Sequence, residues 1–161
     1  MTSGPIDSHQ QDTVVLLDPI PSPATDAPEP FVVANERRVL LAYRIADTDF
    51  ECFGPFGEDD DPSCVVVFLG AAFHQFGPPN DEDLAAHPLA SRGLRAFSAH
   101  EVMNSSFVAD CWGVTSPRDG LRHFVLTLRD STFECVAADY TVAGIYGSCD
   151  IAAREAFSLC A

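Results

Sequence analysis

Short apolar runs separated by polar turns recur along the chain, a pattern typical of a protein rich in β-strands. The clearest case spans residues 121–138, where apolar runs at 124–128 and 133–138 lie on either side of Asp130-Ser131-Thr132. Both runs are rich in aromatic and branched residues, which favour strands, whereas aspartate and serine favour tight turns. The segment therefore predicts a β-hairpin.

An earlier segment has the same order of features. Residues 38–45 contain an apolar run, Asp47-Thr48 supplies a polar turn, and Phe50-Glu51-Cys52 matches Phe133-Glu134-Cys135 of the first hairpin. The match predicts a second hairpin over residues 38–53 and suggests an internal duplication. The alternative is that two unrelated hairpins share a tripeptide, since repeats are best recognised from a period that recurs more than twice.

Other elements follow from local signals. Residues 64–70 form an apolar run without alternation, which predicts a central strand covered on both faces by a helix or a second sheet. Further strands are predicted at residues 71–76, 95–103 and 140–146, and short helical turns broken by Pro88 and Gly93 at residues 83–94. A short helix is predicted at residues 106–112, capped by Asn104 or Ser105. A C-terminal helix is predicted at residues 151–159, capped by Ser148 or Asp150. Its residues expected to face the sheet are Ile151, Ala152, Phe157 and Cys160. We therefore predict an α+β fold with a largely antiparallel sheet of about five to seven strands, flanked by a C-terminal helix and one short helix.

Residues 1–36 differ in composition from the rest of the chain. They contain six acidic residues and no basic one, and five prolines lie between residues 19 and 30. Only residues 13–17 have the character of a strand. We expect residues 1–36 to form a flexible acidic arm and residues 37–161 to form a single domain. The start of the chain has no secretory signal pattern, and no apolar run approaches the ~18 residues of a membrane span, so a cytoplasmic location without membrane association is expected.

The net charge of −15 arises from 24 acidic residues against nine arginines and no lysine. Such a balance disfavours nucleic acid as a partner, because phosphates are repelled. It is compatible with a basic protein partner, and the predicted contact residues are Glu58, Asp59, Asp60 and Asp61 in one loop and Asp81, Glu82 and Asp83 in another. Adaptation to a high-salt cytoplasm, or a GC-rich genome, explains the same composition without a partner.

The six cysteines, at positions 52, 64, 111, 135, 149 and 160, are widely spaced. This spacing predicts free thiols in a reducing compartment and neither a zinc site nor another cofactor. Cys149 is expected to be exposed, because it lies between a predicted strand and a helix start, where the helix dipole lowers a thiol pKa. It is a candidate nucleophile with His74 or His123 as base, although the neighbouring Asp150 opposes thiolate formation.

His100, Glu101, His123 and Glu134 are polar residues within predicted strands. If those strands pair, the four side chains meet and form a catalytic set or the ligands of a metal ion. The alternative is structural. In that case the histidines are satisfied by hydrogen bonds, and Glu134 forms an ion pair with Arg122 or Arg129 that holds the hairpin register.

Several strings between residues 60 and 138 carry a resemblance: His87-Pro88-Leu89, Gly93-Leu94, Glu101-Val102, Asn104-Ser105-Ser106, Arg122-His123-Phe124 and Asp130-Ser131-Thr132-Phe133-Glu134-Cys135. With them the chain resembles a family of small uncharacterised bacterial proteins, a resemblance that implies no activity. The acidic loops, the acidic arm and the absence of a positive patch instead lead us to expect a small acidic binding protein that engages a basic protein partner, as immunity proteins engage toxins. Two alternatives are an enzyme that uses the His/Glu set or Cys149, and a structural or oligomeric component.

Overall fold

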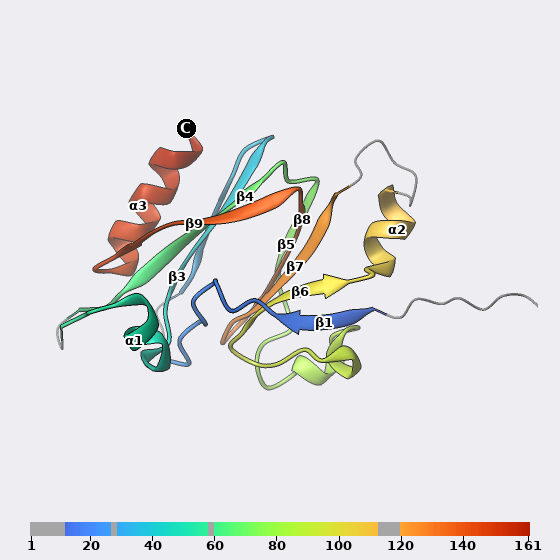
Figure 1. Ribbon diagram of the computed structural model, residues 1–161, viewed down its shortest axis with the longest axis horizontal. Helices are drawn as coiled ribbons and strands as arrows, with labels where there is room; N and C mark the ends of the chain where they lie inside the picture. The colour runs from blue at the N-terminus through green and yellow to red at the C-terminus, as the bar shows by residue number, and fades with distance from the viewer. Residues whose placement is uncertain (1–11, 27–28, 58–59, 113–119) are drawn as a thin grey trace, which may run out of the picture.

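The computed structural model describes residues 12–26, 29–57, 60–112 and 120–161 (Figure 1). In these residues, nine strands form two antiparallel sheets. The five-stranded sheet has the order β1 (Thr13–Leu16), β6 (Ala99–Met103), β7 (Arg122–Thr127), β8 (Thr132–Ala137) and β5 (Phe73–Gly77). The four-stranded sheet has the order β2 (Phe31–Ala34), β3 (Arg38–Arg44), β4 (Ser63–Leu69) and β9 (Asp139–Tyr146). The α+β class and the antiparallel arrangement are confirmed, and the strands are divided between two sheets.

Three helices and three short 3-10 turns complete the described structure. The helices are α1 (Phe50–Phe53), α2 (Ser106–Trp112) and α3 (Cys149–Cys160). The 3-10 turns are η1 (Asp47–Asp49), η2 (Leu84–Ala86) and η3 (Ala90–Arg92). The broken helical turns expected around Pro88 and the two longer predicted helices are therefore confirmed. No helix in the described ranges is both long and apolar enough to cross a lipid bilayer.

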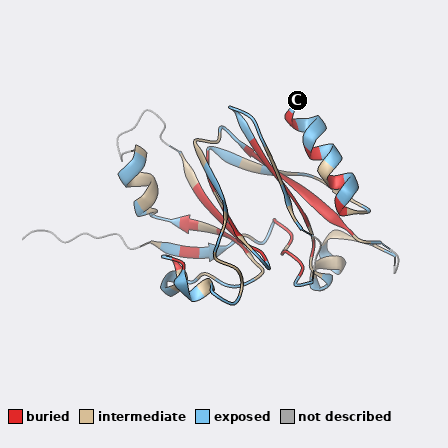
Figure 2. Cartoon of the chain, turned by 180° about the vertical axis from the view of Figure 1, so that it is seen from behind, coloured by how far each residue is buried: buried red, intermediate tan, exposed pale blue. Residues whose placement is uncertain are grey.

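The main core lies between the two sheets. Alternate residues of facing strands interlock there, and the ring centroid of Phe68 in β4 lies 5.4 Å from that of Phe124 in β7 and 5.3 Å from that of Phe133 in β8. Burial of these large aromatic side chains is the main favourable contribution that joins the sheets. Figure 2 shows the buried residues concentrated in the sheets and on the inner side of α3.

Helix α3 covers the other face of the four-stranded sheet. Val65 and Val67 of β4 pack against Ala152 and Ala156, so β4 is buried on both faces, as its unbroken apolar run predicts. The cap at Ser148 is also confirmed, because its hydroxyl accepts a hydrogen bond from the Ile151 amide at 3.3 Å.

The predicted packing face of α3 is partly wrong, since the side chains of Ile151 and Phe157 are 47% and 69% exposed. Two alanines four residues apart face the sheet instead, and their small size lets the helix approach closely.

The hairpin of β7 and β8 is confirmed, but the second predicted hairpin is wrong. Strand β3 is present, whereas Phe50–Phe53 forms α1. The physical reason is that β3 pairs on one side with β2 and on the other with β4, so no position is left for a returning strand. The two segments therefore have different structures and do not support an internal duplication.

The prediction of a flexible arm is wrong for residues 12–26 and 29–36, while residues 1–11 and 27–28 lie outside the described ranges. Strand β1 pairs with β6 in one sheet and β2 pairs with β3 in the other. Between them Ile20 is only 2% exposed, and the Tyr43 hydroxyl donates a hydrogen bond of 2.6 Å to the Pro21 carbonyl. Pro19, Pro21, Pro23 and Pro30 lie in the described parts of the segment that crosses between the sheets, where the lack of an amide donor is tolerated.

Candidate functional site

The candidate site lies on the outer face of the five-stranded sheet. Along β7 and β8, Phe124 and Phe133 point into the core, so their neighbours His123 and Glu134 point to the opposite face. The segment of η2 and η3 lies over this face, where Leu89 packs with residues of β1, β6 and β7. Strand alternation and pairing register therefore bring two of the predicted site residues together.

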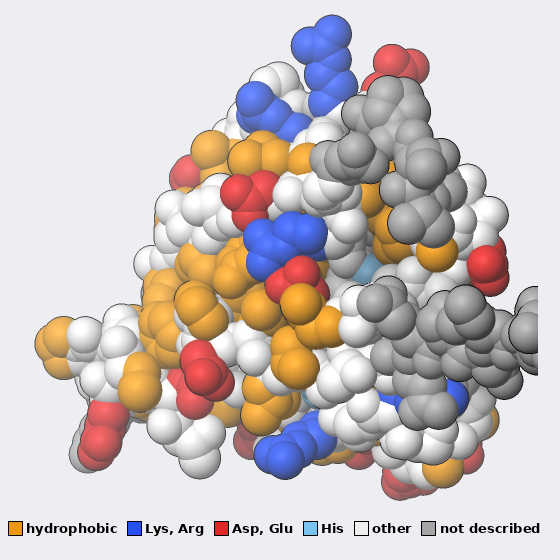
Figure 3. Space-filling view, turned by 45° about the vertical axis from the view of Figure 1, so that its right-hand side comes forward, with side chains coloured by type: hydrophobic (Ala, Val, Ile, Leu, Met, Phe, Trp, Pro, Cys, Tyr) orange, Lys and Arg blue, Asp and Glu red, His pale blue; other side chains and the backbone are white. Residues whose placement is uncertain are grey.

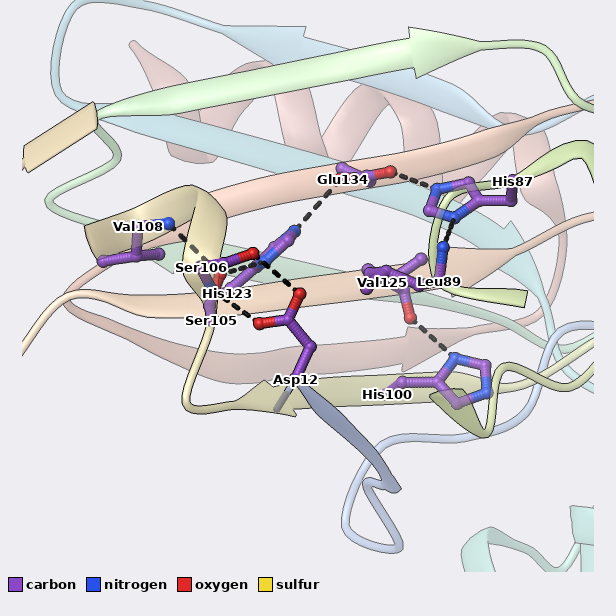
Figure 4. Close-up of polar contacts among 10 residues, drawn as sticks. All are labelled: Asp12, His87, Leu89, His100, Ser105, Ser106, Val108, His123, Val125 and Glu134. Carbon is purple, nitrogen blue, oxygen red and sulfur yellow. Dashed lines mark hydrogen bonds and ion pairs between the residues drawn. The ribbon is translucent and has the colours of Figure 1, made fainter. Parts of the chain in front are cut away.

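Glu134 is held between two imidazoles (Figure 4). The Nε2 atom of His123 lies 3.0 Å from Oε2 of Glu134, and Nε2 of His87 forms a hydrogen bond with Oε1. The side chains of His123, His87 and Glu134 are 3%, 5% and 20% exposed. His87 was missed in the sequence because it lies in a short irregular segment, where no periodicity indicates which way a side chain points.

Backbone and hydroxyl groups indicate where the imidazole protons lie. The Nδ1 atom of His87 accepts a hydrogen bond from the Leu89 amide at 3.0 Å. The ring proton is therefore on Nε2, which donates a hydrogen bond to Glu134. The Ser105 hydroxyl lies 2.8 Å from Nδ1 of His123 and itself accepts from the Val108 amide at 3.2 Å. In this arrangement each histidine donates from Nε2 to a different oxygen of the Glu134 carboxylate.

The hydrogen bonds determine the charge of Glu134. Burial by itself raises the pKa of a carboxyl group, but the hydrogen bonds from His123 and His87, together with electrostatic attraction to the two rings, outweigh it and lower the pKa of Glu134 to about 2. The side chain is therefore an anion at neutral pH, and its low pKa makes it a weak general base. Its chemistry suits the recognition of a positively charged group.

A hollow of about 300 Å³ lies beside Glu134, and we call it the Glu134 hollow. Phe73 and Gln75 of β5, Thr132 and Glu134 of β8, His87 and Phe107 line it together with prolines. The rings of Phe73 and Phe107 are 5.1 Å apart in an edge-to-face arrangement. The hollow is therefore largely apolar and aromatic, with one carboxylate in its wall.

A larger hollow of about 590 Å³ lies elsewhere, between the β2–β3 and β4–β5 turns. Its charged lining residues are Glu36, Arg37 and Arg38, which are exposed at the β2–β3 turn and the start of β3. It also includes Gly120, which adjoins residues 113–119 outside the described ranges. We therefore place the candidate site at the Glu134 hollow, where a half-buried charge has a defined geometry.

His100 and Glu101 do not join this site. The Nδ1 atom of His100 donates to the Val125 carbonyl at 3.0 Å, and its Nε2 accepts from the Arg95 amide at 3.1 Å. Burial lowers the pKa of His100, so the backbone bonds hold a neutral ring. Within the described ranges, no group of three or more His, Cys, Asp or Glu side chains is arranged to hold a metal ion. The prediction that four residues converge is wrong.

The predicted ion pair of Glu134 with an arginine is also wrong. Arg122 lies on the other face of the sheet, because its register partner is Ala137, a core residue. There it forms two hydrogen bonds with Glu101, at 3.0 and 2.7 Å, and one with Asp139 of β9 at 2.9 Å. Arg122 thus links the two sheets, and Glu101 has a structural role.

All six cysteines are free, as predicted, but their exposures are not as expected. Cys149 is 5% exposed and its thiol lies 3.7 Å from the Glu29 carbonyl, whereas Cys52 and Cys111 are exposed. Burial raises the pKa of Cys149, which disfavours the thiolate. The prediction of an exposed, reactive Cys149 is wrong because the first turn of α3 packs against the sheet.

The predicted acidic contact residues that the structure describes belong to two segments, one beside Arg44 and one beside Arg129. Asp61 forms an ion pair of 2.5 Å with Arg44, and the Asp81 amide donates to the Arg129 carbonyl at 2.9 Å. Arg44 and Arg129 line the same narrow hollow, which brings the two segments toward one another. Asp60, Glu82 and Asp83 are exposed, and Glu58 and Asp59 lie outside the described ranges.

Comparisons with protein-family models, curated proteins and solved structures give no match. The site is therefore interpreted from its own geometry. It offers a fixed carboxylate, two imidazoles, one serine hydroxyl and an aromatic hollow.

Proposed function

We propose that the protein binds a basic protein partner and receives an arginine or lysine side chain in the Glu134 hollow. The observation that carries this proposal is the ionised Glu134, 20% exposed in the wall of an aromatic hollow. The hydrogen bonds from both imidazoles hold the carboxylate in place. A cation that enters the hollow therefore gains a charge-assisted hydrogen bond in a partly desolvated position.

The carboxylate has room for a further donor. Each oxygen accepts one histidine hydrogen bond, and a carboxylate oxygen has two lone-pair positions. The aromatic rings of Phe73 and Phe107 add a surface on which a guanidinium or ammonium group is attracted to a ring face. Both features favour a long basic side chain over a neutral one.

The surrounding charge favours the approach of such a partner. Pro78 and Pro79 line the hollow, and Asp81, Glu82 and Asp83 follow in the chain after Asn80. On the described part of the face in Figure 3, basic side chains form separate groups rather than a continuous patch. A net charge of −15 steers basic partners at low ionic strength. Adaptation to salt accounts for the net charge, but gives no reason for an ordered carboxylate inside a hollow.

The resemblance noted in the sequence is compatible with this proposal. His87, Ser105, His123 and Glu134 each come from one of the strings that carry it. We propose that those strings resemble the family because they build this site. A cytoplasmic location is part of the same proposal, since six free thiols suit a reducing compartment.

The test is calorimetric titration with a polyarginine peptide at low and moderate salt. Glu134→Gln should weaken binding by about tenfold or more, whereas Glu101→Gln, which removes a carboxylate from the opposite face, should leave it within about twofold. Circular dichroism checks that both variants are folded. Equal affinity of the parent and a folded Glu134→Gln protein would refute the proposal.

A second function is favoured by one observation, the line of hydrogen bonds from Ser105 through His123 to Glu134. It has the order nucleophile, base and carboxylate, as in serine hydrolases, although here the hydroxyl contacts Nδ1 and the carboxylate contacts Nε2. A fluorophosphonate probe tests it. Labelling that is lost in Ser105→Ala would favour an acyl-transfer enzyme, and no labelling of the parent would exclude this use of Ser105.

A further inference from the structure

Strand β5 is one edge of the five-stranded sheet. It pairs with β8 from Phe73 opposite Val136 to Gly77 opposite Thr132, and no strand pairs with its other side in the described part of the chain. His74, Gln75 and Phe76 are exposed, Phe76 to 41%. Such an edge presents unpaired backbone donors and acceptors to another extended chain.

The other three edges carry features that oppose pairing. Strands β1 and β2 contain four residues each, and β2 lies against α3, where the Asn35 side chain donates to the Cys160 carbonyl at 2.7 Å. Strand β9 begins with Asp139 and has a register shift against β4 between Val65 and Val66. Strand β5 has five residues in regular register and contains no proline, acidic residue, lysine or arginine. It is the edge least protected against an added strand.

The free edge of β5 borders the Glu134 hollow. Gln75 is the register partner of Glu134, and Phe73 and Gln75 line the hollow. A strand added to β5 lies two strand spacings, about 10 Å, from β8. Its alternate side chains on the outer face then point across Gln75 toward Glu134, a span that suits arginine or lysine.

We propose that β5 pairs with an extended basic segment of the partner, which adds a sixth strand to the sheet and places a basic side chain in the Glu134 hollow. The inference rests on the proposed function for the sign of the occupant's charge. Charge complementarity with Glu134 and with Asp81, Glu82 and Asp83 argues for a basic segment. Backbone pairing supplies affinity for any extended chain, and the hollow supplies the preference for a basic residue at one position.

The test uses three synthetic peptides of equal length. In the first, arginine alternates with valine; in the second, arginine alternates with proline, which keeps the charge but removes alternate backbone donors. In the third, glutamine alternates with valine. Titration calorimetry measures affinity, and hydrogen–deuterium exchange measures protection of the amides in residues 73–77.

The first peptide should bind at least about tenfold more tightly than each of the others and should slow amide exchange in β5. Equal affinity for the first and second peptides, or binding without protection of β5, would overturn the inference. In that case the proposed function would still stand if Glu134→Gln weakened the binding of both arginine peptides. No binding of either arginine peptide would refute both proposals.

Two further measurements identify what occupies the edge. Glu134→Gln should abolish the preference for the first peptide over the third while β5 remains protected by the first at saturating concentration. A preference that persists would show that the hollow does not select the basic residue. The second measurement is sedimentation velocity of the protein alone at increasing concentration, and dimerisation that protects β5 without peptide would assign the edge to a second copy of the chain.

Discussion

The Nε2 atom of His123 in β7 lies 3.0 Å from Oε2 of Glu134 in β8, on the face of the sheet that points away from the main core. The two residues are not direct register partners, because His123 is opposite Val136 and Glu134 is opposite Val125. They meet diagonally across the hairpin, a distance that long side chains span. His87, 47 residues before Glu134, completes the arrangement from a separate segment.

Replacement of Glu134 by glutamine should destabilise the protein by about 1–3 kcal/mol at neutral pH, because the amide is a weaker acceptor and its NH₂ group faces a histidine donor. Urea denaturation measures the change. The matched control is Glu82→Gln, an exposed position where the change should stay within about 0.5 kcal/mol. Equal stability of the parent and Glu134→Gln would show that the histidine bonds contribute little.

The stability of the parent should fall in acid through a contribution that Glu134→Gln lacks. The pKa of Glu134 is lowered to about 2 in the folded state by the histidine bonds, which outweigh burial. Its stabilisation is therefore fully present above the unfolded pKa, about 4.3, and is lost as the pH falls toward 2, a difference on the order of 3 kcal/mol. The measurement is unfolding free energy at several pH values, and parallel curves for the two proteins between pH 5 and 2 would contradict it.

Ser105→Ala should cost more stability than Ser148→Ala. Both serines cap a helix, Ser105 through the Val108 amide and Ser148 through the Ile151 amide, and loss of a cap typically costs about 1 kcal/mol. Ser105 in addition supplies the hydrogen bond to Nδ1 of His123, so its loss leaves a buried polar atom unpaired at a further cost of about 1–3 kcal/mol. Equal losses in chemical denaturation would show that the bond to His123 contributes nothing.

Ile20→Ala should destabilise the protein by about 2–5 kcal/mol, because this side chain is 2% exposed in the core between the sheets. Val15→Ala is the control, since Val15 is 39% exposed and should cost less than about 1 kcal/mol. Thermal unfolding followed by circular dichroism compares them. An unchanged melting temperature for Ile20→Ala would mean that the segment before β2 is not docked.

Under native conditions, Cys52 and Cys111 should react with a thiol reagent well before the other four cysteines. They are the exposed thiols, whereas burial raises the pKa of Cys64 and of Cys135 to about 12. Mass spectrometry after timed labelling identifies the modified residues, and all six should react once the protein is denatured. Early labelling of Cys149 would contradict the buried position of the first turn of α3.

Local signals in the sequence determined a large part of the fold. The β7–β8 hairpin follows from two apolar runs around turn residues, and β4 from an unbroken apolar run. The start of α3 follows from a serine whose side chain accepts an amide hydrogen bond. These features were predictable because each depends on interactions between residues close in the chain.

Only the tertiary structure decided which strands are neighbours and which side chains share a face. The local sequence at residues 31–34, Phe-Val-Val-Ala, favours a strand, but the proline-rich acidic composition around it predicts a flexible arm. Pairing with β3 and packing against α3 decide that this segment is ordered as β2. Likewise His123 and Glu134 were identified as polar residues in strands, but pairing register placed them together and sent Arg122 and Glu101 to the other face. Because a strand alternates its faces at every residue, the register between distant segments decides whether Glu134 meets an arginine or two histidines. The charge and the possible function of Glu134 depend on that outcome.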